Sequence, residues 1–268
     1  MTDLFQTLEV TAARGAEGLT REARESVAAA LQSLQRPDGG FAGLDGQSDP
    51  YFSLFAWLSL RALGATYDRD RLCAYLTAHR QSARRIDAQC ADLVLACEGR
   101  ASRFSRLLRA AALWRGGTSE VYDAFLLALA TGPVPRWLAR LAWRRQRHLS
   151  KAGVAERLPT PRLAADLILA TLAGKSDAGL QSALASRQCA NGGFATAAGA
   201  PADLLATAVA RFSLGMRPSP PGSERSHDLA FIEACWLEDG LFGPVPGATQ
   251  GDAEHTFYGL LALGTCRP

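Results

Sequence analysis

Residues 31–64, LQSLQRPDGGFAGLDGQSDPYFSLFAWLSLRALG, contain a pattern that returns twice later in the chain. The other copies are residues 184–215, LASRQCANGGFATAAGAPADLLATAVARFSLG, and residues 231–264, FIEACWLEDGLFGPVPGATQGDAEHTFYGLLALG. In each copy an apolar segment ends at a Gly-rich turn that contains a phenylalanine, a polar loop follows, and a second apolar segment ends at Leu-Gly. Glycine permits the positive φ of a tight helix stop. Repeated helix–turn–helix units are typical of repeat proteins.

An acidic residue precedes the second helix of every copy. Asp49, Asp203 and Asp252 stand where that helix is expected to begin. A carboxylate at this position accepts hydrogen bonds from free backbone N–H groups and opposes the positive end of the helix dipole. We therefore predict that these three residues are N-caps.

Weaker copies of the second helix continue between the clear ones, at residues 87–99, 122–132 and 162–174. Together with the clear copies they predict six units, which is enough to close a ring. The second helices are apolar on nearly all sides, as buried helices are, whereas a first helix such as residues 22–34 keeps a polar face. The predicted fold is all-α, an α6/α6 double-layered toroid of helix-turn-helix repeats, with residues 1–268 forming one domain.

Composition narrows the class of protein. The chain has 268 residues, 48% of them hydrophobic, and a formal net charge of +3. It contains no apolar run long enough to span a bilayer and no basic segment followed by an apolar one at its start, so we predict a cytoplasmic protein. Its six cysteines lack CxxC spacing and are expected to be reduced, mostly buried thiols. Neither GxSxG nor HExxH occurs, which argues against hydrolases and metalloproteases.

Arginines gather in the middle of the chain in two sets with helical spacing. The sets are Arg100, Arg103, Arg106 and Arg109, and then Arg136, Arg140, Arg144 and Arg147. The second set lies in a basic amphipathic segment, RWLARLAWRRQRHLSK, from Arg136 to Lys151. This segment is a solvated outer face, a docking face for an acidic partner, or a contact with an anionic membrane. Nucleic acid is not expected, because no aromatic platform accompanies the charges.

Residues 38–64, DGGFAGLDGQSDPYFSLFAWLSLRALG, closely resemble the repeat of protein prenyltransferase β subunits, a family that also includes squalene and oxidosqualene cyclases. The resemblance extends over residues 31–264. It implies a toroid whose central, aromatic-lined funnel holds an isoprenoid chain. The expected ligand is then a prenyl diphosphate or a polyprenyl lipid, and the expected protein partner is a helical subunit or a second copy of the chain.

Protein prenyltransferases bind zinc through an Asp and a Cys two residues apart at a helix start, and through a His that opens the final helix. By this resemblance Asp203 matches the Asp and His255 matches the His, but Leu205 occupies the Cys position. The loop before Asp203 also lacks the basic residues that the family uses to hold the diphosphate. The resemblance therefore implies a zinc site that is incomplete in this chain.

The cyclase branch of the family implies a different use of the last helix. Class II cyclases protonate an alkene or epoxide with an Asp of a DxDDT motif, and this chain has DAEHT from Asp252 to Thr256. The matching proton donor is Glu254, with Asp252 and His255 as neighbours. A carboxylic acid in an apolar cavity keeps its proton, because burial disfavours the anion. The alternative interpretation is a polar helix start with a capping cluster.

Aromatic residues on the second helices are the predicted substrate-binding set, with simple packing between helices as the alternative. They are Tyr51, Phe55, Tyr122, Phe125, Phe257 and Tyr258. Aromatic faces bury a polyisoprene and can stabilise a carbocation. Three functions stay open: a prenyltransferase-like isoprenoid binder, a class II-like cyclase or isomerase that uses Glu254 as its acid, and a non-catalytic lipid-binding or protein-interaction toroid.

Overall fold

The computed structural model describes residues 4–82, 84–100, 136–146, 155–216 and 225–266. The helices in this part are α1 (Leu4–Glu17), α2 (Arg21–Ser33), α3 (Pro50–Leu63), α4 (Arg69–His79), α5 (Arg85–Cys97), α8 (Arg136–Gln146), the 3-10 helix η2 (Ala155–Arg157), α9 (Thr160–Leu172), α10 (Ala178–Ala185), α11 (Leu204–Gly215), α12 (Arg225–Ala234) and α13 (Ala253–Cys266). A short antiparallel ribbon pairs β1 (Phe194–Ala195) with β2 (Ala202–Asp203). Within these residues, no helix has both the length and the apolar character that a membrane crossing requires.

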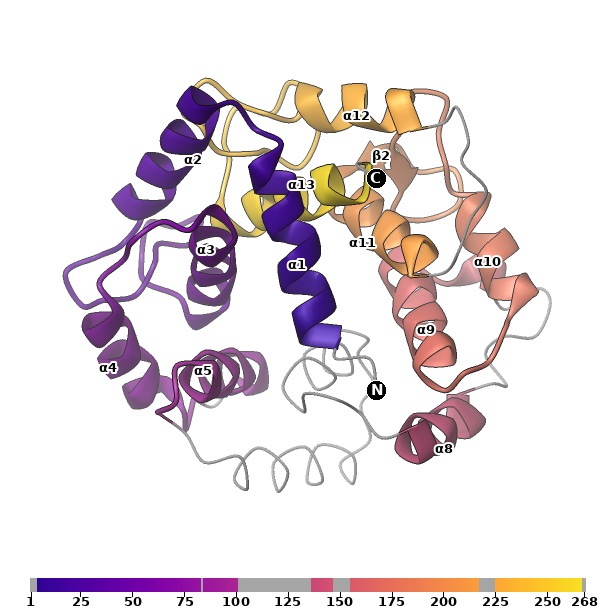
Figure 1. Ribbon diagram of the computed structural model, residues 1–268, viewed down its shortest axis with the longest axis horizontal. Helices are drawn as coiled ribbons and strands as arrows, with labels where there is room; N and C mark the ends of the chain where they lie inside the picture. Colours follow the sequence, from indigo (N-terminus) through magenta and orange to yellow (C-terminus); the bar gives the residue numbers. More distant parts are fainter. Residues whose placement is uncertain (1–3, 83, 101–135, 147–154, 217–224, 267–268) are drawn as a thin grey trace.

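The helices form two layers around a ring (Figure 1). The inner layer runs α9, α11, α13, α3, α5 by contact, and α2, α4, α10 and α12 lie outside it. Because α13, the last helix, packs against α3, the ring closes between the two ends of the chain. The predicted all-α toroid is confirmed. The predicted helix at residues 122–132 lies outside the described residues.

The two layers differ in burial as the sequence predicted. The outer helix α2 buries Val27 and Leu31 and turns the rest of its surface outward or leaves it half-buried. The inner helix α13 is buried along most of its length, with Phe257, Tyr258 and Leu261 each 1% exposed. The apolar core therefore lies around the inner helices.

Each Gly-rich turn docks onto the outer helix of the next unit. The first glycine of the turn has φ of 95°, 92° or 90° in the three copies, a conformation that side chains rarely adopt. A Cβ there would lie 2.1–2.6 Å from an atom of that outer helix. The contacts are Gly39 with Arg71 of α4, Gly192 with His227 of α12, and Gly240 with Ser26 of α2. Since the last turn docks on the first outer helix, the outer layer closes as well.

Each capping Asp is followed, four residues later, by a hydroxyl that ties the helix to its turn. The predicted caps are confirmed: Asp49, Asp203 and Asp252 each accept a backbone N–H of the first helical turn. The hydroxyl oxygen then accepts the backbone N–H of the turn phenylalanine at 2.8–3.1 Å. The pairs are Ser53 with Phe41, Thr207 with Phe194, and Thr256 with Phe242. The Asp-x-x-x-Ser/Thr spacing is therefore a further element of the repeat.

The N-terminal helix α1 lies outside the repeat and was not predicted. It packs across α13 and α3, and Figure 1 shows it over the middle of the ring. Leu4, Leu8 and Ala12 form its buried face. The Leu-Gly pair that was expected to end the last helix has a different role, because α13 continues through Gly264 to Cys266. Gly264 instead lets α1 approach closely.

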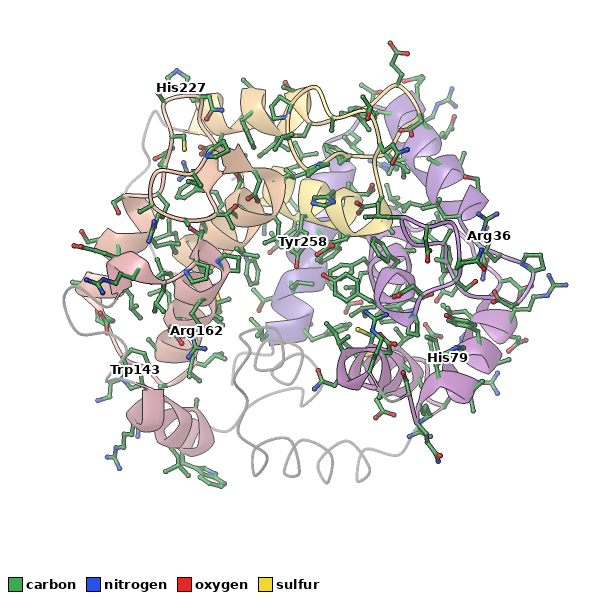
Figure 2. The ribbon with its side chains drawn as sticks, turned by 180° about the vertical axis from the view of Figure 1, so that it is seen from behind. Arg36, His79, Trp143, Arg162, His227 and Tyr258 are labelled. Carbon is green, nitrogen blue, oxygen red and sulfur yellow. The ribbon has the colours of Figure 1, made fainter. Side chains whose placement is uncertain are left out.

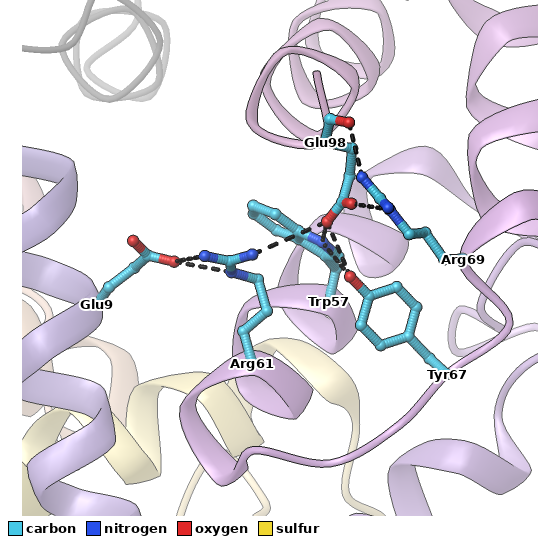
Figure 3. A network of polar contacts seen from close by, with 6 residues as sticks. All are labelled: Glu9, Trp57, Arg61, Tyr67, Arg69 and Glu98. Atoms are coloured by element: carbon cyan, nitrogen blue, oxygen red, sulfur yellow. Dashed lines mark hydrogen bonds and ion pairs between the residues drawn. The ribbon is translucent and has the colours of Figure 1, made fainter. Parts of the chain in front are cut away.

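A buried carboxylate, Glu98 at the end of α5, joins α3, the loop that follows it and α4 (Figure 3). Its Oε1 accepts the indole N–H of Trp57 at 2.7 Å and the hydroxyl of Tyr67 at 2.8 Å. Arg69 forms an ion pair with its other oxygen. Arg61, 3.9 Å from Glu98, also pairs with Glu9 of α1 at 2.8 Å. The network therefore connects α1 to the inner layer.

Two opposing effects set the charge of Glu98. Burial raises the pKa of a carboxyl group, but the hydrogen bonds from Trp57, Tyr67 and Arg69 favour the anion and leave the pKa of Glu98 below its ordinary value. Burial, followed by the hydrogen bond to Glu98, raises the pKa of Tyr67 to about 12. The carboxylate is therefore ionised and the phenol neutral at neutral pH.

All six cysteines lie in the described part of the chain and are free, in agreement with the prediction of reduced thiols. Cys73, Cys90 and Cys235 are buried as expected, whereas the other three are only partly buried. Burial, with a smaller effect from the charge of Asp203, raises the pKa of Cys235 to about 12. This thiol is therefore held in its unreactive, protonated form.

Candidate functional site

The first turn of α13 gathers three of the predicted site residues. Asp252, Glu254 and His255 each offer a ligand atom, and these atoms lie within 4.8 Å of one another. Both carboxylate oxygens of Asp252 contact His255. Oδ1 accepts the backbone N–H of His255 at 2.8 Å, and Oδ2 contacts Nδ1 of the His255 ring at 2.7 Å. Because a cap and its third helical residue face each other, this pair follows directly from helix geometry. The contact holds the imidazole in place and leaves Nε2 as the nitrogen available to a ligand.

The surroundings of His255 favour its cationic form. Burial by itself lowers the pKa of an imidazole, but the hydrogen bond and the charge of Asp252, followed by the charges of Glu254 and Asp203, outweigh that effect. The pKa of His255 is therefore raised above its ordinary value of 6.5. The start of α13 thus combines carboxylates with an imidazolium that persists toward neutral pH.

Glu254 is connected to the opposite end of the chain. The hydroxyl of Tyr51, in the first turn of α3, donates a hydrogen bond to Oε1 of Glu254. This contact joins the first and last repeat units at the ring closure. Tyr51 was predicted as an aromatic contact for substrate, and sequence reasoning did not anticipate its polar partner.

An aromatic cluster includes the ring of the same Tyr51. The ring of Tyr51 meets Phe55 at 4.9 Å between centroids, and Phe55 meets Phe257 at 5.6 Å and Tyr258 at 5.5 Å. Phe55, Phe257 and Tyr258 are each 1% exposed, whereas Tyr51 is partly exposed. Figure 2 labels Tyr258 near the middle of the ring. The structure thus brings four of the six predicted aromatic residues together, and Tyr122 and Phe125 lie outside the described residues.

Asp203 of the neighbouring unit is close enough to His255 for their charges to interact. Burial raises the pKa of Asp203, while the hydrogen bond of its cap and the charge of His255 lower it, and the net shift is upward. Its Oδ1 caps α11 through the N–H of Ala206 at 2.6 Å, and its Oδ2 accepts the hydroxyl of Thr196. Thr196 is a member of the site that no sequence pattern indicated, because it belongs to the variable loop of the repeat.

The donors around Asp203 and His255 do not fit the zinc site that the resemblance implied. Leu205 stands where that site has a thiolate, and its aliphatic side chain offers no donor atom. Both oxygens of Asp203 are already bound by a helix cap and by Thr196. Asp252 is likewise committed to the backbone and ring of His255. We therefore assign no chemical step to zinc.

The helix starts around this site already carry negative charge. Asp49, Asp203 and Asp252 cap three inner helices with their own carboxylates. The exposed Arg84 at the start of α5 is paired with Asp49 at 3.2 Å and with Asp87 at 3.6 Å. The dipole ends of α3, α11 and α13, and the charge of Arg84, are thus offset by carboxylates of the protein itself. This arrangement disfavours a diphosphate at these helix starts.

Comparison with known families agrees with the fold. A family model for the prenyltransferase alpha-alpha toroid domain matches residues 4–92 and 163–267. The match includes the three clear repeat copies and every residue of the site described above. None of the curated proteins compared with the chain matches it. The family links the protein to isoprenoid-related function in general. By its two layers of repeat helices and by a match over most of its length, the chain belongs to the prenyltransferase alpha-alpha toroid domain family.

Proposed function

We propose that this protein is a prenyltransferase β-subunit-like isoprenoid binder that holds the apolar chain of its ligand beside the Tyr51–Glu254 hydrogen bond. The observation that carries the proposal is the convergence of a polar group and an aromatic cluster where α3 meets α13. A polyprenyl chain gains about 0.8 kcal/mol for each CH₂ group removed from water, so the affinity should increase with the length of chain that the site buries. The family link to isoprenoids supports this choice of ligand.

The charges of the site favour a neutral head group over a diphosphate. Carboxylates cap the neighbouring helix starts, and Glu254 stands beside the aromatic cluster. The imidazolium of His255 is paired with Asp252 at 2.7 Å, so it offsets that carboxylate and leaves the others. A diphosphate would meet these carboxylates without the zinc and basic residues that offset its charge in protein prenyltransferases. The alcohol of the same chain length avoids this repulsion.

Binding of geranylgeraniol and of geranylgeranyl diphosphate, each with and without zinc, tests the proposal by native mass spectrometry. We expect the alcohol to bind at least as tightly as the diphosphate, without an effect of zinc. Glu254→Gln removes one negative charge and should shift the preference toward the diphosphate by a few-fold, whereas Glu25→Gln on the exposed surface of α2 should not. Zinc-dependent binding of the diphosphate alone would contradict the proposal, and binding of neither ligand would favour an interaction toroid.

The Tyr51–Glu254 contact also favours a second function, protonation of a polyprenyl alkene as in class II cyclases. Glu254 would donate its proton to an alkene carbon, and the resulting cation would later lose a proton to a base and restore a double bond. The Tyr51 hydroxyl can accept from the protonated acid and donate to the carboxylate that remains. The imidazolium of His255 would stabilise that carboxylate, while the ring of Tyr51, the partly exposed member of the aromatic cluster, would stabilise the cation.

Glu254→Gln separates this second function from binding alone. Loss of a positioned acid costs about a hundredfold or more in turnover, whereas the neutral isostere preserves the shape of the site. We therefore expect product formed from geranylgeraniol, measured by gas chromatography with mass spectrometry, to fall by at least about a hundredfold with little change in affinity. Glu25→Gln serves as the matched control. Equal turnover in the two variants would rule out Glu254 as the acid.

A further inference from the structure

Helix α8 presents two different faces. Ala139 and Trp143, four residues apart, are 1% and 9% exposed and lie on the face that packs against α9. Trp137 and Leu141, also four residues apart, are 67% and 43% exposed on the opposite face. Figure 2 labels Trp143 on α8 at the outer edge of the molecule. The fold therefore uses one apolar stripe of α8 and leaves a second one open to solvent.

The exposed stripe is bordered by positive charge. Arg140 and Arg144, at positions three and seven after Trp137, are exposed on the same face. The Nε of Arg140 donates to the carbonyl of Ala173 at 3.2 Å, which places α8 beside the loop that carries the exposed Lys175. The helix sequence, RWLARLAWRRQ, contains no acidic residue. An apolar pair framed by cations is complementary to a surface that is apolar beneath an anionic layer.

We propose that this face of α8, formed by Trp137, Arg140, Leu141 and Arg144, is a docking site for an anionic lipid bilayer. Indole rings prefer the depth of the lipid head groups, where their apolar body is buried and their N–H stays hydrated. Leucine at the adjacent position adds apolar contact below the head groups, and the guanidinium groups reach lipid phosphates. The docking site is independent of the ligand proposed for the ring.

The arrangement favours a bilayer over the two other interpretations of this segment. A merely solvated face needs no apolar residues, yet two of the five large apolar side chains that are exposed in the described part of the chain lie one turn apart here. The five are Val10, Leu44, Trp137, Leu141 and Val245. An acidic protein partner would also use an indole and arginines, because protein interfaces are rich in both. The charges in α8 around this indole, which is 67% exposed, are all positive, and this matches the continuous anionic layer of a bilayer better than the mixed charges of a protein surface.

Sedimentation with vesicles tests the proposal directly. We expect the protein to bind vesicles of phosphatidylcholine mixed with phosphatidylserine and to bind vesicles of phosphatidylcholine alone at least about tenfold more weakly. Each basic residue near an anionic surface contributes roughly a fivefold increase in partitioning, so Arg140→Gln with Arg144→Gln should lower binding by about 25-fold. Trp137→Ser with Leu141→Ser should lower it by at least about tenfold. All four side chains are exposed, and the buried Ala139 and Trp143 hold α8 in place without the hydrogen bond of Arg140, so these variants are expected to fold.

Matched controls replace exposed leucine and arginine side chains on other helices and loops. Leu44 is 69% exposed, and the side chains of Arg21 and Arg71 are 82% and 65% exposed on α2 and α4. Leu44→Ser, and Arg21→Gln with Arg71→Gln, should leave vesicle binding unchanged. Binding that the α8 variants and the controls lower equally would overturn the proposal. The proposal would also be overturned if the protein did not bind phosphatidylserine vesicles but bound soluble polyglutamate through α8. That result would identify an acidic protein as the partner.

Discussion

Replacing Gly264 by valine should lower the free energy of unfolding by at least about 3 kcal/mol and separate α1 from α13. A Cβ on Gly264 would lie 1.8 Å from the carbonyl oxygen of Thr11, and a Cβ on Gly15 would lie 1.9 Å from that of Leu260. Both obstacles are backbone atoms, so no side chain can rotate away. The two helices must therefore move apart.

The size of the effect follows from what α1 buries. Leu4 and Leu8 are 1% and 0% exposed, and exposing such a side chain costs about 1.5–3 kcal/mol. Gly215→Val is the matched control, because Gly215 is also helical and a Cβ there meets nothing within 4 Å. We expect the control to change stability by less than about 0.5 kcal/mol.

Urea denaturation measures both variants, and limited proteolysis of α1 shows whether the helix has detached. Valine at position 264 should make α1 susceptible to protease while the ring of repeats remains resistant. If the two glycine variants have the same free energy of unfolding, the close contact between α1 and α13 does not stabilise the fold.

The repeat explains why most of the ring could be predicted. The turn glycines, the capping aspartates and the all-apolar inner helices are local features, and each recurs at the same place in the clear copies. Helix α1 has no copy elsewhere, so periodicity could not reveal it. Gly264 was misinterpreted for the same reason: a helix-ending glycine such as Gly64, with φ of 65°, and a helix-packing glycine look alike in sequence.

The contacts of the candidate site also fall into local ones, which the sequence could predict, and distant ones, which it could not. The contact of Asp252 with His255 spans three residues and follows from capping geometry, so the sequence could predict it. The hydrogen bond between Tyr51 and Glu254 joins residues that are 203 positions apart, and only ring closure brings them together. A single sequence carries no local sign of such a pair. Glu98 was likewise seen only as part of a helix segment, since its partners come from α3, α4 and the loop between them.

Replacing Glu98 by leucine should cost about 2 kcal/mol of stability at neutral pH. The hydroxyl of Tyr67 would lose its acceptor, which costs about 1–3 kcal/mol, whereas the indole N–H of Trp57 would lose Glu98 but keep the Tyr67 oxygen at 3.0 Å as its acceptor. The partly exposed arginines can return to water, so they add little to this loss. Glu25→Leu, on the exposed face of α2, should change stability by less than about 0.5 kcal/mol.

The charge of Glu98 gives this effect a defined pH dependence. Because the pKa of Glu98 is lower in the folded protein than its ordinary value of 4.5, the ionised side chain stabilises the fold at pH values above 4.5. That contribution is lost as the pH falls through the folded pKa. Glu98→Gln keeps the shape but cannot ionise, so the difference in stability between wild type and this variant should be constant near neutral pH and shrink below about pH 4.5. Urea denaturation across this range measures the difference. A gap that stays constant into acid would mean that Glu98 stabilises the ring by its shape and neutral hydrogen bonds, and that its charge contributes nothing.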